Sequence, residues 1–229
     1  MNDGSRIDEL LGLRRAGVAV SFQETAPDGL PRIDAAAVAG CKYWKLAAEG
    51  HSFYTEASAH YGCPIGSHTH GIELPTENAQ ELESMLGTMV QLEYIDMDEV
   101  PGIPQLDQPF GVAIYTPLAD AETEPDVVII SGNAKQMMLL GEAVHAAGLA
   151  TDASAVGRPT CAAIPAVIQS GAAATNLGCI GNRVYSDLAD DELYFALAGS
   201  QLASVVDKLI TIIRANQELE SFHTARNRN

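Results

Sequence analysis

The chain has few basic residues. Its 229 residues include 13 Lys and Arg but 30 Asp and Glu, which gives a formal net charge of −17 at pH 7. Proteins that bind nucleic acids or anionic lipids use Lys and Arg to neutralise phosphate groups, so a strongly acidic chain repels both. We therefore expect neither a nucleic acid nor a membrane surface among its partners.

Long apolar runs are also missing. No stretch reaches the 18 or more apolar residues that a membrane-spanning helix needs. The N-terminus lacks the basic start and apolar centre of a secretion signal, and residues 5–15 have the pattern of an amphipathic helix instead. Apolar residues still make up 47% of the chain, which is enough to bury a sizeable core. These features predict a cytoplasmic globular protein with one domain, 1–229.

Several familiar motifs do not occur. The chain contains neither the Gly-x-Ser-x-Gly turn of α/β-hydrolases nor the His-Glu-x-x-His helix of zinc proteases. Residues 127–136 have the outline of a strand, a glycine turn and a helix, which is typical of anion binding. They lack both glycine-rich nucleotide-binding patterns, so the sequence does not support a nucleotide-binding function.

Alternating strand and helix patterns predict the fold class. Strands are expected at 17–22, 52–57, 89–95, 111–118, 127–132 and 191–199. Helices are expected at 5–15, 34–49, 76–87 and 133–147, within 154–171, and at 201–219, with Asp34, Asn133 and Ser200 as N-caps. We expect an α/β or α+β fold with one mixed sheet.

Four cysteines, Cys41, Cys63, Cys161 and Cys179, include no Cys-x-x-Cys pair. Their spacing therefore gives no support for a zinc ribbon or a thioredoxin-like motif. A disulfide framework is not expected in a cytoplasmic chain. Buried, inert thiols are one interpretation, because cysteine is among the most buried residue types.

Short matches indicate two similar, intertwined halves. The segment "GCPIG" at 62–66 resembles "GCIG" at 178–181, and "GVAV" at 17–20 resembles "GVAI" at 111–114. Each half would contain a strand, a helix with a cysteine, and a Gly-Cys turn. We interpret the pattern as a diverged internal duplication. The halves would span about 16–75 and 111–190.

Such a duplication would bring the four cysteines together about a pseudo-two-fold axis. Soft thiolate ligands suit an iron–sulfur cluster or another thiophilic metal centre. The leading hypothesis is a redox protein whose metal ligands are Cys41, Cys63, Cys161 and Cys179. Its anion-contacting shell would contain Arg158, Asn182 and Arg183, and its partner would be a small molecule or a redox protein.

Two other functions remain open. Cys179 could be a catalytic nucleophile on a small acyl or thiol substrate, with Arg183 lowering its pKa. Alternatively, the protein could be a binding module for a small anion or for haem. His68 and His70 would share one face of a strand and could ligate a metal or haem, or could lie in a polar surface loop. The apolar helix 201–219 fits either a homodimer or core packing.

Four ordered motifs resemble those of a known family. They are "CKYWKLAAEGHSFYTEASAHYGCPIGSHTHG", "GRPTCAAIPAVIQSG", "NLGCIGNR" and "DDELYFALAG". Over residues 8–220 the chain resembles the DUF169 family of uncharacterised proteins, which are common in archaea and anaerobic bacteria. The resemblance implies family cysteines at Cys63, Cys161 and Cys179, and often at Cys41, but assigns no position to His68 or His70. It implies no activity, although the association with anaerobes is consistent with an oxygen-sensitive centre.

Overall fold

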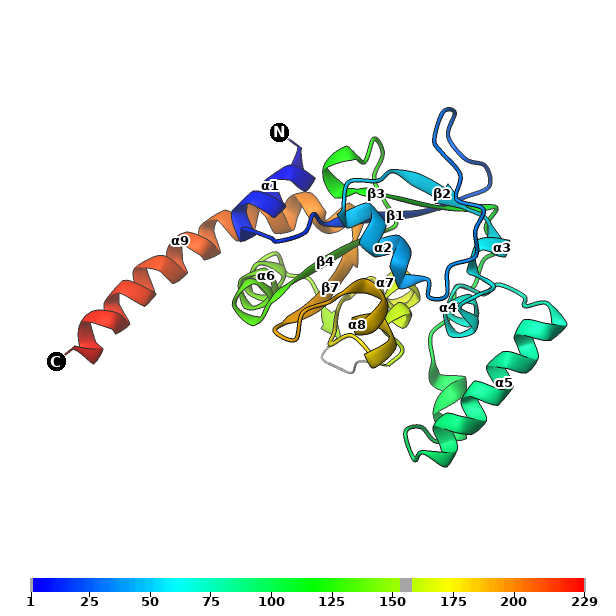
Figure 1. The fold of residues 1–229 in the computed structure, drawn as a ribbon. Coiled ribbons are helices and arrows are strands. Elements are labelled where there is room, and N and C mark those ends of the chain that lie inside the picture. Colours follow the sequence, from blue (N-terminus) through cyan, green and yellow to red (C-terminus); the bar gives the residue numbers. More distant parts are fainter. Residues whose placement is uncertain (1, 153–157, 229) are drawn as a thin grey trace.

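A mixed seven-stranded sheet lies at the centre of the computed structural model, which describes residues 2–152 and 158–228 (Figure 1). The strands are β1 (Val18–Gln23), β2 (Phe53–Thr55), β3 (Val112–Pro117), β4 (Val127–Asn133), β5 (Thr151–Asp152), β6 (Ala173–Asn176) and β7 (Glu192–Ala198). Their order is β2-β3-β1-β4-β7-β6-β5, and the pairs are antiparallel except for the parallel pair β5–β6. The predicted mixed α/β fold is confirmed.

Helices of different lengths surround this sheet. The α-helices are α1 (Asp3–Leu11), α2 (Cys41–Ala48), α3 (Ala57–His60), α4 (Pro64–Thr69), α5 (Thr76–Gln91), α6 (Ala134–Ala146), α7 (Ala163–Ser170), α8 (Ile180–Ser186) and α9 (Leu202–Asn227). The 3-10 helices are η1 (Met97–Gly102), η2 (Leu118–Asp120), η3 (Thr160–Ala162) and η4 (Gly199–Gln201). Among the described residues, no helix combines the length and the apolar character needed to cross a membrane.

The two faces of the sheet carry separate cores, because successive side chains of a strand point to opposite faces. The first core is built around Tyr43, Trp44, Phe53, Tyr115 and Ile164, on the face that α2 and α7 cover. It also receives Val127 and Ile129 of β4.

The second core lies on the opposite face, where it receives Val128 and Ile130 of β4. Its other members come from α1, α6 and α9 and include Ile7, Leu140, Val205 and Leu209. Figure 1 shows these three helices together on one side of the molecule. The second half of α9 projects beyond the body. The predicted homodimer is not tested by this arrangement and remains a prediction.

Local sequence signals explain some element boundaries. Asn133 caps α6 as predicted: its side chain accepts the Gln136 N–H at 3.0 Å, and the Gln136 side chain accepts the Asn133 N–H at 2.8 Å. Gly4 allows a close approach of α1 to η2, because a Cβ there would lie 2.4 Å from the carbonyl oxygen of Leu118. Such local signals fix the ends of elements but not the layer each one joins.

Some predicted elements differ from the structure. The helix predicted over 34–49 begins only at Cys41, and Asp34 forms an ion pair with Arg32 instead of capping it. The strand predicted at 89–95 is wrong, because α5 continues to Gln91 and Glu93 takes a left-handed backbone conformation.

The last helix also begins later than predicted. Ser200 does not cap it, since Ser200 lies within η4 and α9 starts at Leu202. Strand β6, Ala173–Asn176, was not predicted. The start of the predicted 154–171 segment lies outside the described residues, and the internal duplication remains a prediction.

Helix α5 lies apart from the sheet and its covering helices (Figure 1). None of its residues is buried. The helix and the following η1 form an extension that we call the arm, residues 76–102. The arm faces the first-core side of the body, where it bounds the cavity described below.

Candidate functional site

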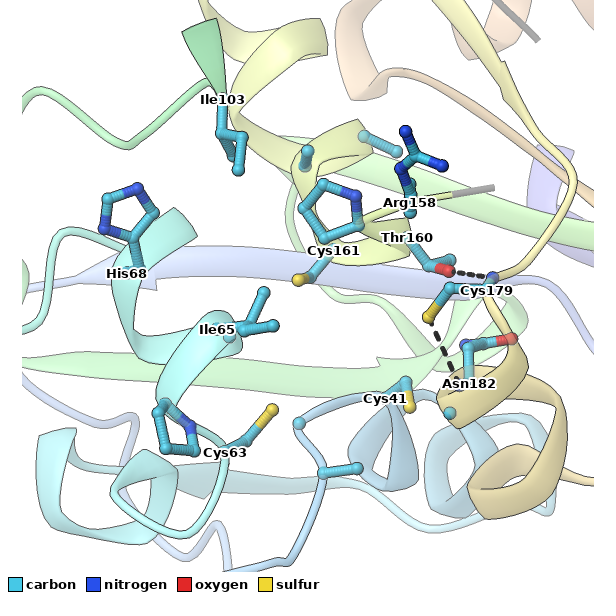
Figure 2. Close-up of a pocket in the computed structure, with 18 of the residues that line it drawn as sticks. Cys41, Cys63, Ile65, His68, Ile103, Arg158, Thr160, Cys161, Cys179 and Asn182 are labelled. Atoms are coloured by element: carbon cyan, nitrogen blue, oxygen red, sulfur yellow. Dashed lines mark hydrogen bonds between the residues drawn. The ribbon is translucent and has the colours of Figure 1, made fainter. Parts of the chain in front are cut away.

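A cavity of about 830 Å³ lies between the arm and the first-core side of the body. Its wall comes from α2, α4, the arm, η3, α7 and α8, from the strands β5 and β6, and from loops that adjoin these elements. Apolar side chains make up most of it, such as Leu86 and the residues Ile65 and Ile103 that Figure 2 labels. A cavity of this size and character is typical of a site for a small organic molecule.

All four cysteines line this cavity. Cys41 is the first residue of α2 and Cys63 immediately precedes α4. Cys161 lies in η3, and Cys179 is the N-cap of α8. Figure 2 shows the four side chains on different parts of the wall. The fold thus brings these distant positions to one void.

The predicted metal centre is nevertheless wrong. In residues 2–152 and 158–228, no group of three or more His, Cys, Asp or Glu side chains could hold a metal ion. The four thiols are free and border a void from separate elements. A thiolate–metal centre instead needs sulfur atoms that converge on one point, at roughly 2.3 Å from a zinc ion. The assignment of Cys41, Cys63, Cys161 and Cys179 as ligands, and the redox function based on it, are not supported.

Burial keeps most of these thiols protonated at neutral pH. Burial raises the pKa of Cys41 to about 12 and also raises the pKa of Cys63 and of Cys161. Backbone groups of Gly40 and Gly66 form hydrogen bonds with the Cys63 sulfur, which lower its pKa. Burial has the larger effect, so the pKa of Cys63 is still raised. Such thiols act as small, mostly apolar parts of the wall.

Cys179 has a different local setting. Its sulfur accepts the Asn182 N–H at 3.4 Å, and its own N–H donates to the Thr160 hydroxyl at 2.7 Å (Figure 2). These bonds fix the Cys179 side chain between η3 and α8. The predicted roles of Cys179 as a nucleophile and of haem as a ligand are not tested by this geometry and stay predictions.

The two predicted arginines have different positions. Arg158 lines the cavity, but its guanidinium donates to the Glu99 carboxylate at 3.1 and 3.3 Å and lies 4.7 Å from the centre of the Tyr94 ring. Its charge is therefore already balanced within the wall.

Arg183 is not among the described residues of the wall. It donates instead to the carbonyl oxygens of Leu177, Ala189 and Glu192, the latter two at 2.8 and 3.0 Å. Asn182, the third residue predicted with the arginines, does line the cavity and is buried. Arg183 thus holds the backbone around α8 rather than a ligand.

The burial of His60 beside His70 was not predicted from the sequence. His60 and His70 are 1% and 3% exposed, with ring centroids 5.4 Å apart. Burial lowers the pKa of His60 to about 3 and that of His70 to about 4, so both are neutral at pH 7. Both alternatives for His68 and His70, a shared strand face and a polar surface loop, are wrong, because His68 lies in α4 and the buried His70 is the C-cap of that helix. No sequence spacing links His60 to His70, since their meeting depends on how α3 and α4 fold back together.

Comparisons with known proteins agree with the motif resemblance. The DUF169 model, described as uncharacterised ArCR, matches residues 6–208. The uncharacterized protein MJ0308 of Methanocaldococcus jannaschii is 24% identical over 217 residues, which cover 90% of this chain and 92% of that protein. No solved structure matches the chain. Neither the description of the family nor the name of the relative states an activity.

Proposed function

The chain belongs to the DUF169 family, and from that premise we propose that it binds a small, largely apolar organic molecule without negative charge in the cavity. The observation that carries the proposal is the cavity itself. Its volume of about 830 Å³ lies within the range of ligand pockets, and its wall is mostly apolar.

The apolar side of α5 supports this proposal. Leu82, Met85, Leu86 and Met89 recur at helical spacing and all border the cavity. None of them is buried, so this side of the helix has no core to pack against. A bound apolar molecule would cover these side chains, and methionine adapts readily to ligands of different shape.

The charges of the wall argue against an anionic ligand. The described wall contains the acidic residues Glu81, Glu99 and Asp152 but only one arginine, Arg158, which Glu99 already pairs. With a net chain charge of −17, this arrangement repels anions. A neutral or cationic molecule is therefore the better fit.

Binding of N-phenyl-1-naphthylamine, a neutral dye that fluoresces in apolar surroundings, tests the proposal. We expect saturable binding of one dye molecule per chain. Ala166 lines the cavity from α7, so the substitution Ala166→Phe should fill part of the space and weaken binding by about tenfold or more.

Ile168→Phe is the matched control. Ile168 lies on the same helix, is 42% exposed and is not part of the described wall. The control should bind the dye as the wild type does, and thermal melting should show that both variants are folded. A folded Ala166→Phe variant with wild-type affinity, or a wild-type protein that leaves the dye dark, would refute the proposed function.

A further inference from the structure

Within the part of the chain that the structure describes, two buried ring nitrogens beside the cavity have no hydrogen-bond partner. They are His60 Nδ1 and His70 Nε2, and they belong to the two rings whose centroids lie 5.4 Å apart. His70 lines the cavity directly. A buried polar atom without a partner is rare in proteins and costs free energy, so this pair needs an explanation.

The partner of His70 determines which of its nitrogens carries the proton. His70 Nδ1 lies 2.7 Å from the carbonyl oxygen of Gly66, which can only accept a hydrogen bond. Nδ1 must therefore be the protonated nitrogen of the neutral ring. His70 Nε2 is left as an acceptor with a free lone pair.

His60 meets a hydroxyl group, which can donate or accept a hydrogen bond. The Thr55 hydroxyl oxygen lies 3.4 Å from the Ala113 carbonyl oxygen and 2.9 Å from His60 Nε2. The hydroxyl has one proton: if it goes to the Ala113 carbonyl, the oxygen accepts the His60 Nε2–H and His60 Nδ1 is an acceptor, and if it goes to His60 Nε2, Nδ1 carries the ring proton. In both cases His60 Nδ1 has no partner among the described residues. It lies 3.9 Å from the place a Cβ would take on Gly40, another residue of the cavity wall.

We propose that the free acceptor of His70, in the wall beside His60, forms a subsite that selects ligands with a neutral hydroxyl or N–H group. The ligand would donate this group to His70 Nε2 while its apolar body fills the cavity between the arm and the first core. The inference rests on the proposed function and narrows the ligand to alcohols, phenols and amides with an apolar body. Ethers lack the donor, and a carboxylate would direct its own lone pairs at the acceptor His70 Nε2.

A matched pair of ligands tests the subsite. We expect calorimetry at pH 7 to show that wild-type protein binds 1-naphthol about tenfold more tightly than 1-methoxynaphthalene, which has the same rings but no donor. In His70→Phe this preference should disappear, while the affinity for the ether changes little.

His68→Phe is the control variant, because His68 lines the same cavity but its ring nitrogens contact the Gln105 amide. It should keep the preference for the naphthol. A measurement without any variant is also decisive: in nitrogen NMR, the unprotonated Nε2 signal of His70 should shift with 1-naphthol and stay unchanged with the ether.

The outcomes separate this inference from the proposed function. Equal affinity of wild-type protein for the two naphthalenes, or a preference that survives in His70→Phe, overturns the subsite while dye binding still supports the cavity. An Nε2 signal that is already protonated in the free protein overturns the subsite too. Failure of the dye and of both naphthalenes to bind overturns the proposed function itself.

Discussion

Arg183 shows how one side chain can fix the backbone beside a cavity. Its guanidinium bonds three carbonyl oxygens, those of Leu177, Ala189 and Glu192, on both sides of α8. Those bonds position the helix that carries Cys179 and Asn182. The nearby cysteine made Arg183 look like a ligand-binding residue in the sequence, but a sequence does not reveal which carbonyl groups turn toward a side chain.

We expect Arg183→Met to lower the free energy of unfolding by about 2–4 kcal/mol, because it leaves several carbonyl groups without a donor. Arg183→Lys should recover only part of this loss, since an ammonium group lacks the planar set of donors. Urea denaturation measures both changes.

Lys135→Met is the control for Arg183. Lys135 pairs with Glu220 on the surface, where both side chains are 64% exposed, so its loss should cost at most about 0.5 kcal/mol. Equal effects of Arg183→Met and Lys135→Met would contradict the backbone-holding role.

At the scale of elements, α5 is helical without belonging to a core. We expect Met85→Asp, on its cavity side, to reduce dye binding by about tenfold or more but to change the free energy of unfolding by less than about 1 kcal/mol. The reason is that Met85 borders the cavity and yet no residue of α5 is buried.

Thr88→Asp adds the same charge to an exposed part of α5 outside the described wall and should leave dye binding unchanged. Dye titration and urea denaturation of both variants separate binding from stability. If Met85→Asp cost as much stability as a core substitution, roughly 3 kcal/mol, α5 would be part of the folded core instead.

How far the sequence predicts each element depends on its side chains. β1, β3, β4 and β7 are rich in β-branched and aromatic residues, and their positions agree with the predictions. The short run 89–95 alternates between apolar and polar residues like a strand, but it begins with the last turn of α5. The apolar residues in that turn are compatible with the two-residue repeat of a strand and with the 3.6-residue repeat of a helix. β6, with the sequence AATN, has side chains too small to give a strand signal.

The sequence identified segments of the site but not their arrangement in space. The cysteine-bearing turns did identify segments of the cavity wall. Spacing along the chain, however, contains no distances between sulfur atoms, so it could not distinguish a void from a metal centre. The arm and the buried imidazoles depend on tertiary contacts that leave no local pattern.

At the scale of the whole molecule, the buried imidazoles predict how stability depends on pH. The unfolded chain binds protons on His60 and His70 below their ordinary pKa of 6.5, whereas the native pKa values are about 3 and about 4. Unfolding therefore takes up protons as the pH falls below 6.5. We expect each histidine to lower the free energy of unfolding by up to about 1.4 kcal/mol per pH unit between pH 6 and 4.

Urea denaturation of wild-type protein and of His70→Phe over this pH range measures the effect. The two proteins share all other titrating groups, so the difference between their slopes reports His70. The free energy of unfolding should decline less steeply with falling pH in His70→Phe than in the wild type. Identical slopes would mean that His70 is protonated in the native state.

The sheet separates the surface that would meet a ligand from a second core, none of whose residues belongs to the described cavity wall. Substitutions among α1, α6 and α9 would then alter robustness to heat without altering what is recognised. Substitutions in the arm and in α8 would instead change which ligand fits, because both elements line the cavity. The ligand preference can thus change on one face of the sheet while the core on the other face continues to stabilise the fold.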